Sequence, residues 1–198
     1  MDDRVRKRWW LIVFMLLACL AVCIWMNAIC PQTETLIVNV LDVGQGDAIF
    51  ITAPDGKQIL IDGGPDSSVL QELGEVMPPL DRSIDLVVLT HPDADHVTGL
   101  VPVLERYAVA MILEKHLPEH TTAVYNRWQE LERSEGAELA EARTGMQIEI
   151  TEEYRFETYV SDSIEDNVNN NSVVLKLMYQ DDCLMLLTGD IEADEEAD

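Results

Sequence analysis

The feature that most restricts the fold of this chain is a run of metal-binding side chains placed directly after a buried strand. Asp85 to Thr90 is apolar and β-branched, and it continues without a break into His91-Pro92-Asp93-Ala94-Asp95-His96. Imidazoles and carboxylates at this spacing are ligands that Zn²⁺, Mn²⁺ and Fe accept. Because a strand end presents a loop rigidly, we predict a metal site here. A solvated acidic loop is the alternative, and the two bracketing histidines argue against it.

The rest of the pattern predicts short strands interleaved with helices. β-Branched runs predict strands at residues 36–43, 48–52, 58–62, 111–113, 172–178 and 184–188, and two more within 146–160. Glycine at 44 and 46 predicts a hairpin between the first two strands. Helices are predicted at 67–76, with Ser67 as its N-cap, at 98–106 and at 121–136. This alternation is typical of a layered α/β domain.

The N-terminal segment has a different composition. Trp9 to Ile29 contains no charged residue, and a basic cluster precedes it within residues 4–8. A helix of this length spans about 31 Å, close to the hydrocarbon thickness of a bilayer. We therefore predict a single transmembrane helix at residues 9–30, with residues 1–8 cytoplasmic and the domain, residues 31–198, outside. The alternatives are a cleaved signal peptide, which would leave the domain secreted, a lipid-modified Cys30, and a buried core helix.

Charge limits the partners of the domain. The chain carries a net charge of −24, and residues 31–198 hold nine basic and 35 acidic side chains, a balance of −26. The basic residues are scattered singly along the sequence. Since a polyanion is bound through clustered Lys and Arg, this composition excludes a basic nucleic-acid-binding module of the usual kind. The sequence does not indicate an oligomeric state.

Five motifs occur in an order that resembles one family. They are Asp42–Ala48, Ile61–Gly64, Thr90–His96, Asn171–Leu175 and Leu187–Asp190. Together they resemble the metallo-β-lactamase-fold hydrolases. The Val-Gly-Gln-Gly-Asp opening, and Asp93 in place of a second histidine, are similar to the C-terminal domain of ComEC-type competence proteins. The resemblance implies a metallo-β-lactamase-like αββα sandwich. Because that fold continues past the Gly-Asp motif to a late metal-binding histidine, we expect the domain to be C-terminally incomplete.

The resemblance also implies a site that holds two divalent metal ions, Zn²⁺ as first choice and Mn²⁺ as the alternative. The side chains that match the family's ligands are His91 and Asp93 for one ion, Asp95 and His96 for the other, and Asp190 as the bridge. Asp62 and Asp47 match positions that support the ligands from behind. Asp95 would additionally orient the attacking hydroxide and is the predicted catalytic residue. Asn169 or Asn170 would face the site as a weak ligand, where the family often has histidine.

A second histidine motif, His116-Leu117-Pro118-Glu119-His120, fits the His-x-x-Glu-His pattern of some zinc proteases. That mechanism needs both histidines on one helical face, and Pro118 opposes a helix between them. We therefore predict a loop, with a second metal site as the alternative.

The function that the resemblance implies is a membrane-anchored, extracytoplasmic hydrolase of phosphodiester bonds, with a DNA strand taken up in competence as one substrate. The acidic domain disfavours long DNA, so small phosphodiesters, esters and lactones stay open. A hypothesis of another class is an inactive, anchored binding module with an incomplete metal site, because the chain contains just four histidines.

Overall fold

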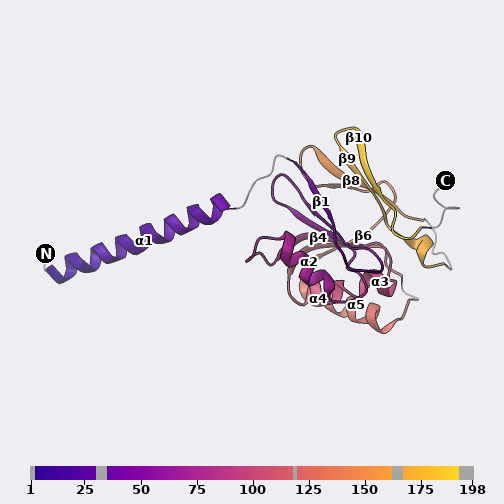
Figure 1. The fold of residues 1–198 in the computed structure, drawn as a ribbon, viewed down its shortest axis with the longest axis horizontal. Coiled ribbons are helices and arrows are strands. Elements are labelled where there is room, and N and C mark those ends of the chain that lie inside the picture. The colour runs from indigo at the N-terminus through magenta and orange to yellow at the C-terminus, as the bar shows by residue number, and fades with distance from the viewer. Residues whose placement is uncertain (1–2, 30–34, 118–119, 162–166, 192–198) are drawn as a thin grey trace. The chain divides into compact units, whose positions relative to one another are not determined.

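The computed structural model describes residues 3–29, 35–117, 120–161 and 167–191 (Figure 1). The chain divides into two compact units, residues 1–32 and residues 33–198. In the first unit, helix α1 (Asp3–Ile29) exposes its large apolar side chains between Trp9 and Val22. Within the described residues, no helix is both long and apolar enough to cross a membrane. The predicted transmembrane helix is therefore not confirmed, and Cys30 lies outside the described residues.

The second unit contains a six-stranded mixed sheet. Its strands follow chain order and are β1 (Ile37–Val40), β2 (Ile49–Thr52), β3 (Gln58–Ile61), β4 (Ser83–Leu89), β5 (Ala108–Glu114) and β6 (Glu138–Glu141). β1, β2 and β3 pair antiparallel, which confirms the predicted hairpin. β3, β4, β5 and β6 pair in parallel, so their carboxyl ends share one edge of the sheet. The long connections that parallel pairing requires are helical.

These connecting helices form one layer. They are α2 (Ser68–Val76), α3 (Ala94–Val97), α4 (Leu100–Leu104) and α5 (Ala123–Glu135). They cover the face of the six-stranded sheet that is turned away from β8, β9 and β10 (Figure 1). α5 packs against both α3 and α4, and therefore supports the short helix that ends the metal-binding motif.

A four-stranded antiparallel sheet covers the other face. Its strands, in spatial order, are β10 (Asp182–Leu187), β9 (Val174–Tyr179), β8 (Tyr154–Tyr159) and β7 (Gln147–Glu149). Consecutive residues of the central strands pack on opposite faces of the sheet, because strand side chains alternate. Val87 lies in the core beneath the helices, whereas Val88 lies in the core between the sheets.

The predicted mixed α/β architecture is confirmed, with three layers in the described part of the chain. The second helical layer of the expected αββα sandwich is not among these residues. Three local predictions need correction. Residues 94–97, taken as loop, form helix α3, and β6 was not predicted. Ser67 precedes α2 but makes no side-chain capping bond, because Asp66 Oδ1 accepts from the Ser68 amide instead.

Candidate metal centre

The candidate site lies at the shared carboxyl edge of β3 and β4. Asp62 directly follows β3, and Thr90 and His91 directly follow β4. The Asp62 amide donates to the Val88 carbonyl over 2.9 Å, which continues the parallel pairing to the edge. The parallel pairing of β3 and β4 thus brings together the Ile61–Gly64 and Thr90–His96 motifs, which helix α2 separates in the sequence.

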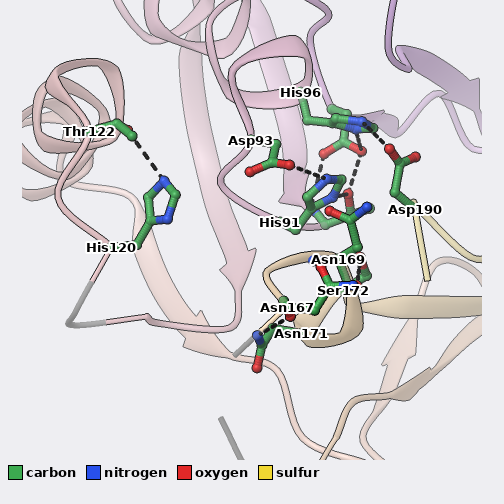
Figure 2. A network of polar contacts seen from close by, with 12 residues as sticks. His91, Asp93, His96, His120, Thr122, Asn167, Asn169, Asn171, Ser172 and Asp190 are labelled. Carbon is green, nitrogen blue, oxygen red and sulfur yellow. Dashed lines mark hydrogen bonds and ion pairs between the residues drawn. The ribbon is translucent and has the colours of Figure 1, made fainter. Parts of the chain in front are cut away.

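One group of metal-capable side chains converges among the residues that the structure describes. Ligand atoms of His91, His96 and Asp190 all lie within 4.8 Å of one another. The two imidazole centroids are 4.1 Å apart, and Asp190 Oδ2 lies 3.5 Å from His96 Nε2 (Figure 2). Asp190 arrives from the far end of the chain, just past β10. The fold therefore closes the site with a carboxylate from the second sheet.

Hydrogen-bond partners outside the cluster determine which ring nitrogen of each histidine carries the proton. Asp62 Oδ2 lies 2.9 Å from His96 Nδ1, and a carboxylate only accepts, so Nδ1 carries the proton. The Thr90 hydroxyl donates to the same Asp62 oxygen over 2.6 Å. That hydroxyl can then accept from His91 Nδ1 at 3.0 Å. Both Nε2 atoms are consequently left to face the cluster, as metal-ligating histidines require.

The buried Nε2 atoms provide the test of whether these residues fit a cation. His91 and His96 are 2% and 0% exposed, and Nε2 of each is buried without a hydrogen-bond partner in the described structure. A buried polar atom without a partner costs about 1–3 kcal/mol. Two such atoms aimed at one carboxylate form a donor set suited to a divalent metal, so the residues present fit the group that the sequence predicts.

The surroundings shift the pKa values of the two imidazoles in opposite directions. Burial and the neighbouring His96 lower the pKa of His91. Burial also opposes the charged form of His96, but the hydrogen bond and charge of Asp62, together with Asp190 and Asp95, raise the pKa of His96 to about 9. The negative surroundings of His96 therefore favour a positive charge at this position.

The other predicted site residues lie around this group. Asp93 Oδ2 is 3.8 Å from His91 Nε2, and Asp95 lies close enough to influence the charge of His96. Neither belongs to the converging group of three. Both are half-buried, Asp93 at the N-cap of α3 and Asp95 in its first turn.

Asp47 reaches the site from the glycine-containing loop between β1 and β2. Although Asp47 is exposed, partial desolvation raises its pKa, His96 opposes the rise, and the Asp62 and Asp190 carboxylates add to it. A Cβ on Gly46 would lie 1.9 Å from the Asp95 carbonyl oxygen. Glycine is therefore required for this loop to approach the metal-binding motif.

A cavity of about 180 Å³ adjoins the site, and it is lined in part by Asp47, Asp62, Thr90 and Thr188. Thr188 also lines a groove of about 600 Å³ on the outer side of the second sheet. The cavity beside the site and the outer groove thus share Thr188 as a lining residue.

The second histidine motif is a loop where it is described, and it does not join the site. His116 and His120 lie in irregular segments before α5, and residues 118–119 fall outside the described structure. Figure 2 shows His120 away from His91 and beside Thr122, the N-cap of α5. Thr90 is the functional residue that sequence reasoning missed as such. Its signal was a single hydroxyl at the end of an otherwise apolar strand.

Comparison with known proteins agrees with this geometry. Residues 41–168 match the sequence profile of the Metallo-beta-lactamase superfamily. This chain therefore belongs to the metallo-β-lactamase superfamily. It is also 27% identical to ComE operon protein 3 of Bacillus subtilis (strain 168), which confirms the ComEC-like resemblance. That alignment covers 80% of this chain and 22% of the relative, so the chain spans about a fifth of the length of that protein.

Solved structures support the fold alone. A metallo-beta-lactamase from Cronobacter sakazakii, in a mutant form, has a TM-score of 0.51 at 13% identity, covering 75% of this chain and 61% of that one. Rm3 metallo-beta-lactamase has a TM-score of 0.50 at 14% identity, with 80% and 64% covered. CmlA, a diiron beta-hydroxylase from Streptomyces venezuelae, also scores 0.50 at 14% identity, with 78% and 30% covered. Because one fold carries different chemistries, the reaction must be argued from the site.

Proposed function

We propose that this chain is a metal-dependent hydrolase that binds two divalent cations, Zn²⁺ or Mn²⁺, and cleaves phosphodiester bonds. The observation that carries the proposal is the convergence, within 4.8 Å, of the Asp190 carboxylate and two buried imidazole nitrogens that have no hydrogen-bond partner in the described structure. Members of this superfamily are usually metal-dependent hydrolases. Bound cations of this kind polarise an electrophile and lower the pKa of water towards about 7.

Each side chain of the site has a separate role in this proposal. In this proposal His91 and Asp93 would hold one cation and Asp95 and His96 the other, with Asp190 as a ligand shared by both. Asp62 and Thr90 fix the imidazole rings, since their hydrogen bonds occupy both Nδ1 atoms. Asp95 would orient the attacking oxygen, and Asp47 at the rim would support the ligands.

The charge distribution favours a short phosphodiester over a long one. Two divalent cations would add about +4 at the site, enough to attract one phosphodiester group. The remainder of the domain, at −26, repels a polyanion beyond that point. In this proposal the likeness to ComEC-type proteins supports a DNA strand as substrate, threaded as a single strand whose contacts are confined to the site.

A second candidate follows from the same acidic surface. Esters or lactones without a negative charge would approach the site with no repulsion, and the 600 Å³ groove beside Thr188 has room for an apolar substituent. If the metal is bound by the converging group of three alone, an inactive binding module is the remaining alternative. Asp93 and Asp95 lie outside that group.

We further propose that residues 9–30 attach the domain to a membrane and leave it outside the cytoplasm. The support is the absence of charge from Trp9 to Ile29 and the exposure of the apolar side chains described within it. Fractionation of cells expressing residues 1–198 and residues 31–198 tests this: we expect the long form in membranes and the short form in the soluble fraction. Equal distribution of both would contradict the attachment.

A substrate panel tests the hydrolase proposal. Purified protein loaded with Zn²⁺ or Mn²⁺ is assayed on a chromogenic phosphodiester, a lactone and single-stranded DNA. We expect turnover of the small phosphodiester, abolished in His96→Ala and unchanged in His120→Ala, whose side chain lies outside the cluster. Turnover of the lactone alone would favour the second candidate. Full metal binding with no turnover of any substrate would favour the binding module.

A further inference from the structure

Lys115 is the first residue beyond strand β5, at the same edge of the sheet as the candidate metal centre. The last residue of β5, Glu114, pairs in register with Leu89, and the metal-binding motif begins two residues after Leu89. The half-buried Lys115 side chain extends from this edge towards the second sheet. Its ammonium group therefore does not take part in the strand pairing of the first sheet, and it lies where the two sheets meet.

The Lys115 ammonium joins both ends of one segment. Nζ donates to the Ser161 carbonyl over 3.0 Å and to Asn171 Oδ1 over 3.0 Å. These acceptors lie on either side of the connection between β8 and β9. A half-buried ammonium that donates to two oxygens forms charge-assisted bonds, which are stronger than neutral ones. Lys115 is thus a clamp across the base of this connection.

Residues 167–171, the described part of this connection next to Asn171, form a compact turn beside the site. Asn171, 1% exposed, donates through Nδ2 to the Asn167 carbonyl over 3.0 Å, and Ser172 Oγ donates to the Asn169 carbonyl over 2.6 Å. The next amide, Val173 N, donates to the Thr90 carbonyl over 2.8 Å. The turn is therefore bonded on one side to Lys115 and on the other to the strand end that carries His91.

The turn presents a side chain to the cluster. In Figure 2 the Asn169 side chain points towards the His91 imidazole, from the side opposite His96. Asn169 occupies the short helix η1 (Asn169–Asn171), whose position depends on the Asn171 contacts just described. A shift of this helix would move Asn169 together with the Val173 amide that donates to the Thr90 carbonyl.

From these contacts we propose that Lys115 is a positioning residue of the metal centre: its ammonium holds the Asn167–Asn171 turn against the His91 side of the cluster. The proposal rests on the metal binding in the proposed function, but not on its substrate. Outer partners of metal ligands typically contribute about 10–100-fold in metal affinity. Since Lys115 acts through the turn, its effect should fall on the ion held at His91.

Three variants separate the clamp from a general effect of losing a lysine. Lys115→Met removes the ammonium and keeps an unbranched side chain. Lys57→Met is the matched control, because Lys57 Nζ also donates to a carbonyl of another element, that of Ile150, remote from the metal-binding motif in the sheet. Lys115→Arg retains the charge and the donors, and should restore what Lys115→Met loses.

The first measurement is amide hydrogen exchange on metal-free protein. We expect Lys115→Met to exchange at least about 10-fold faster than wild type at Asn171, Ser172 and Val173, while Lys57→Met and Lys115→Arg stay close to wild type there. This readout requires no metal and no turnover. Unchanged exchange at these three amides in Lys115→Met would overturn the clamp.

The second measurement is a Co²⁺ titration followed by visible absorption. We expect Lys115→Met to weaken one of two binding steps about 10-fold or more and to change its ligand-field bands, with Lys115→Arg and Lys57→Met like wild type. Equal affinities and spectra for wild type and Lys115→Met would overturn the positioning role even if the wild type hydrolyses phosphodiesters. A weakened step in a protein that hydrolyses none of the panel would keep this inference and end the proposed function. If the wild type binds no Co²⁺, the positioning role of Lys115 and the proposed function both fail, whatever the exchange data show.

Discussion

Asp62 and His96 form a buried pair, with Oδ2 of the carboxylate 2.9 Å from Nδ1 of the imidazole and both residues no more than 1% exposed. Asp62 holds this position with φ +56°, a left-handed conformation at the end of β3. Its other oxygen accepts from the Thr90 amide over 2.8 Å. One carboxylate therefore orients the ring of His96 and the strand end that carries His91, and it does so without entering the cluster.

Asp62→Asn tests this arrangement, because Asn tolerates the left-handed conformation and the change removes only the charge and one acceptor. The new amide must point an N–H at either the Thr90 amide or the His96 ring, both of which donate. We expect metal affinity to fall about 10–100-fold, measured by competition with a chromogenic chelator. Asp66→Asn, on the exposed turn before α2, is the control. Wild-type affinity in Asp62→Asn would show that the pair does not support the site.

Asp190→Asn tests the contribution of the second sheet to the site. The change keeps the shape of the side chain and removes the charge that lies 3.5 Å from His96 Nε2. We expect a loss of metal affinity on the order of 100-fold, with turnover lost in parallel. Asp182→Asn, at the exposed start of β10, should change neither quantity. Retention of two tightly bound ions by Asp190→Asn would contradict its place in the centre.

Gly46→Ala and Gly44→Ala separate backbone strain from close approach. Both glycines have positive φ, +67° and +85°, so alanine costs about 1–2 kcal/mol at either position. At Gly46 the Cβ also meets the Asp95 carbonyl at 1.9 Å, whereas at Gly44 nothing lies within 4 Å. We expect chemical unfolding to show a loss at least about 2 kcal/mol larger for Gly46→Ala. Equal losses would mean that the loop does not contact the motif closely.

A buried acid pair outside the metal centre predicts a pH dependence of stability. Glu114 on β5 and Glu132 on α5 are 8% and 5% exposed, and the Trp128 indole donates to Glu114 over 2.8 Å. Burial raises the pKa of Glu114, and burial together with the charge of Glu114 raises the pKa of Glu132 to about 8. A proton on Glu132 lets the two carboxyl groups share a hydrogen bond. Its contribution is complete below the unfolded value of 4.5 and is lost as the pH rises through about 8.

Glu132→Gln should remove this dependence, since its amide donates to Glu114 at every pH. At about pH 9 we expect the variant to be more stable than wild type by about 1–3 kcal/mol in denaturant unfolding, and the difference to shrink towards pH 5. Glu130→Gln, on the exposed face of α5, should keep the wild-type slope. Parallel stability curves for wild type and Glu132→Gln would refute the shared proton.

The sequence could predict the elements that depend on neighbouring residues, but not those that depend on residues far away in the chain. The β1–β2 hairpin and α5, with its Thr122 cap and the left-handed Gly136 that ends it, follow from neighbouring residues. Strand β6, of sequence Glu-Leu-Ala-Glu, was not predictable in this way, because it forms by pairing with β5 rather than by β propensity. Helix α3 was hidden for a related reason: four residues are too few to establish a helical period, and the polar motif masks it.

The site was predictable where chemistry is local. His91 and His96 were evident from their spacing after a strand, while the inclusion of Asp190 depended on the resemblance to a family rather than on any local pattern. Lys115 and Thr90 gave no comparable signal. Their partners, Asn171 for Lys115 and Asp62 for Thr90, lie about 30 or more residues away in the sequence. The packing of the two sheets brings Asn171 to Lys115, and the pairing of β3 with β4 brings Asp62 to Thr90.

Metal content is the most direct test of the central claim, that His91, His96 and Asp190 enclose a metal centre. The domain of residues 31–198 is purified without chelators, equilibrated with Zn²⁺ or Mn²⁺, dialysed and analysed by mass spectrometry of the elements, beside the His96→Ala and His120→Ala variants. We predict about two ions per chain for wild type and His120→Ala and fewer than about one for His96→Ala. Wild-type protein that is folded by circular dichroism yet retains no metal, or His96→Ala protein that retains as much as wild type, would contradict the account.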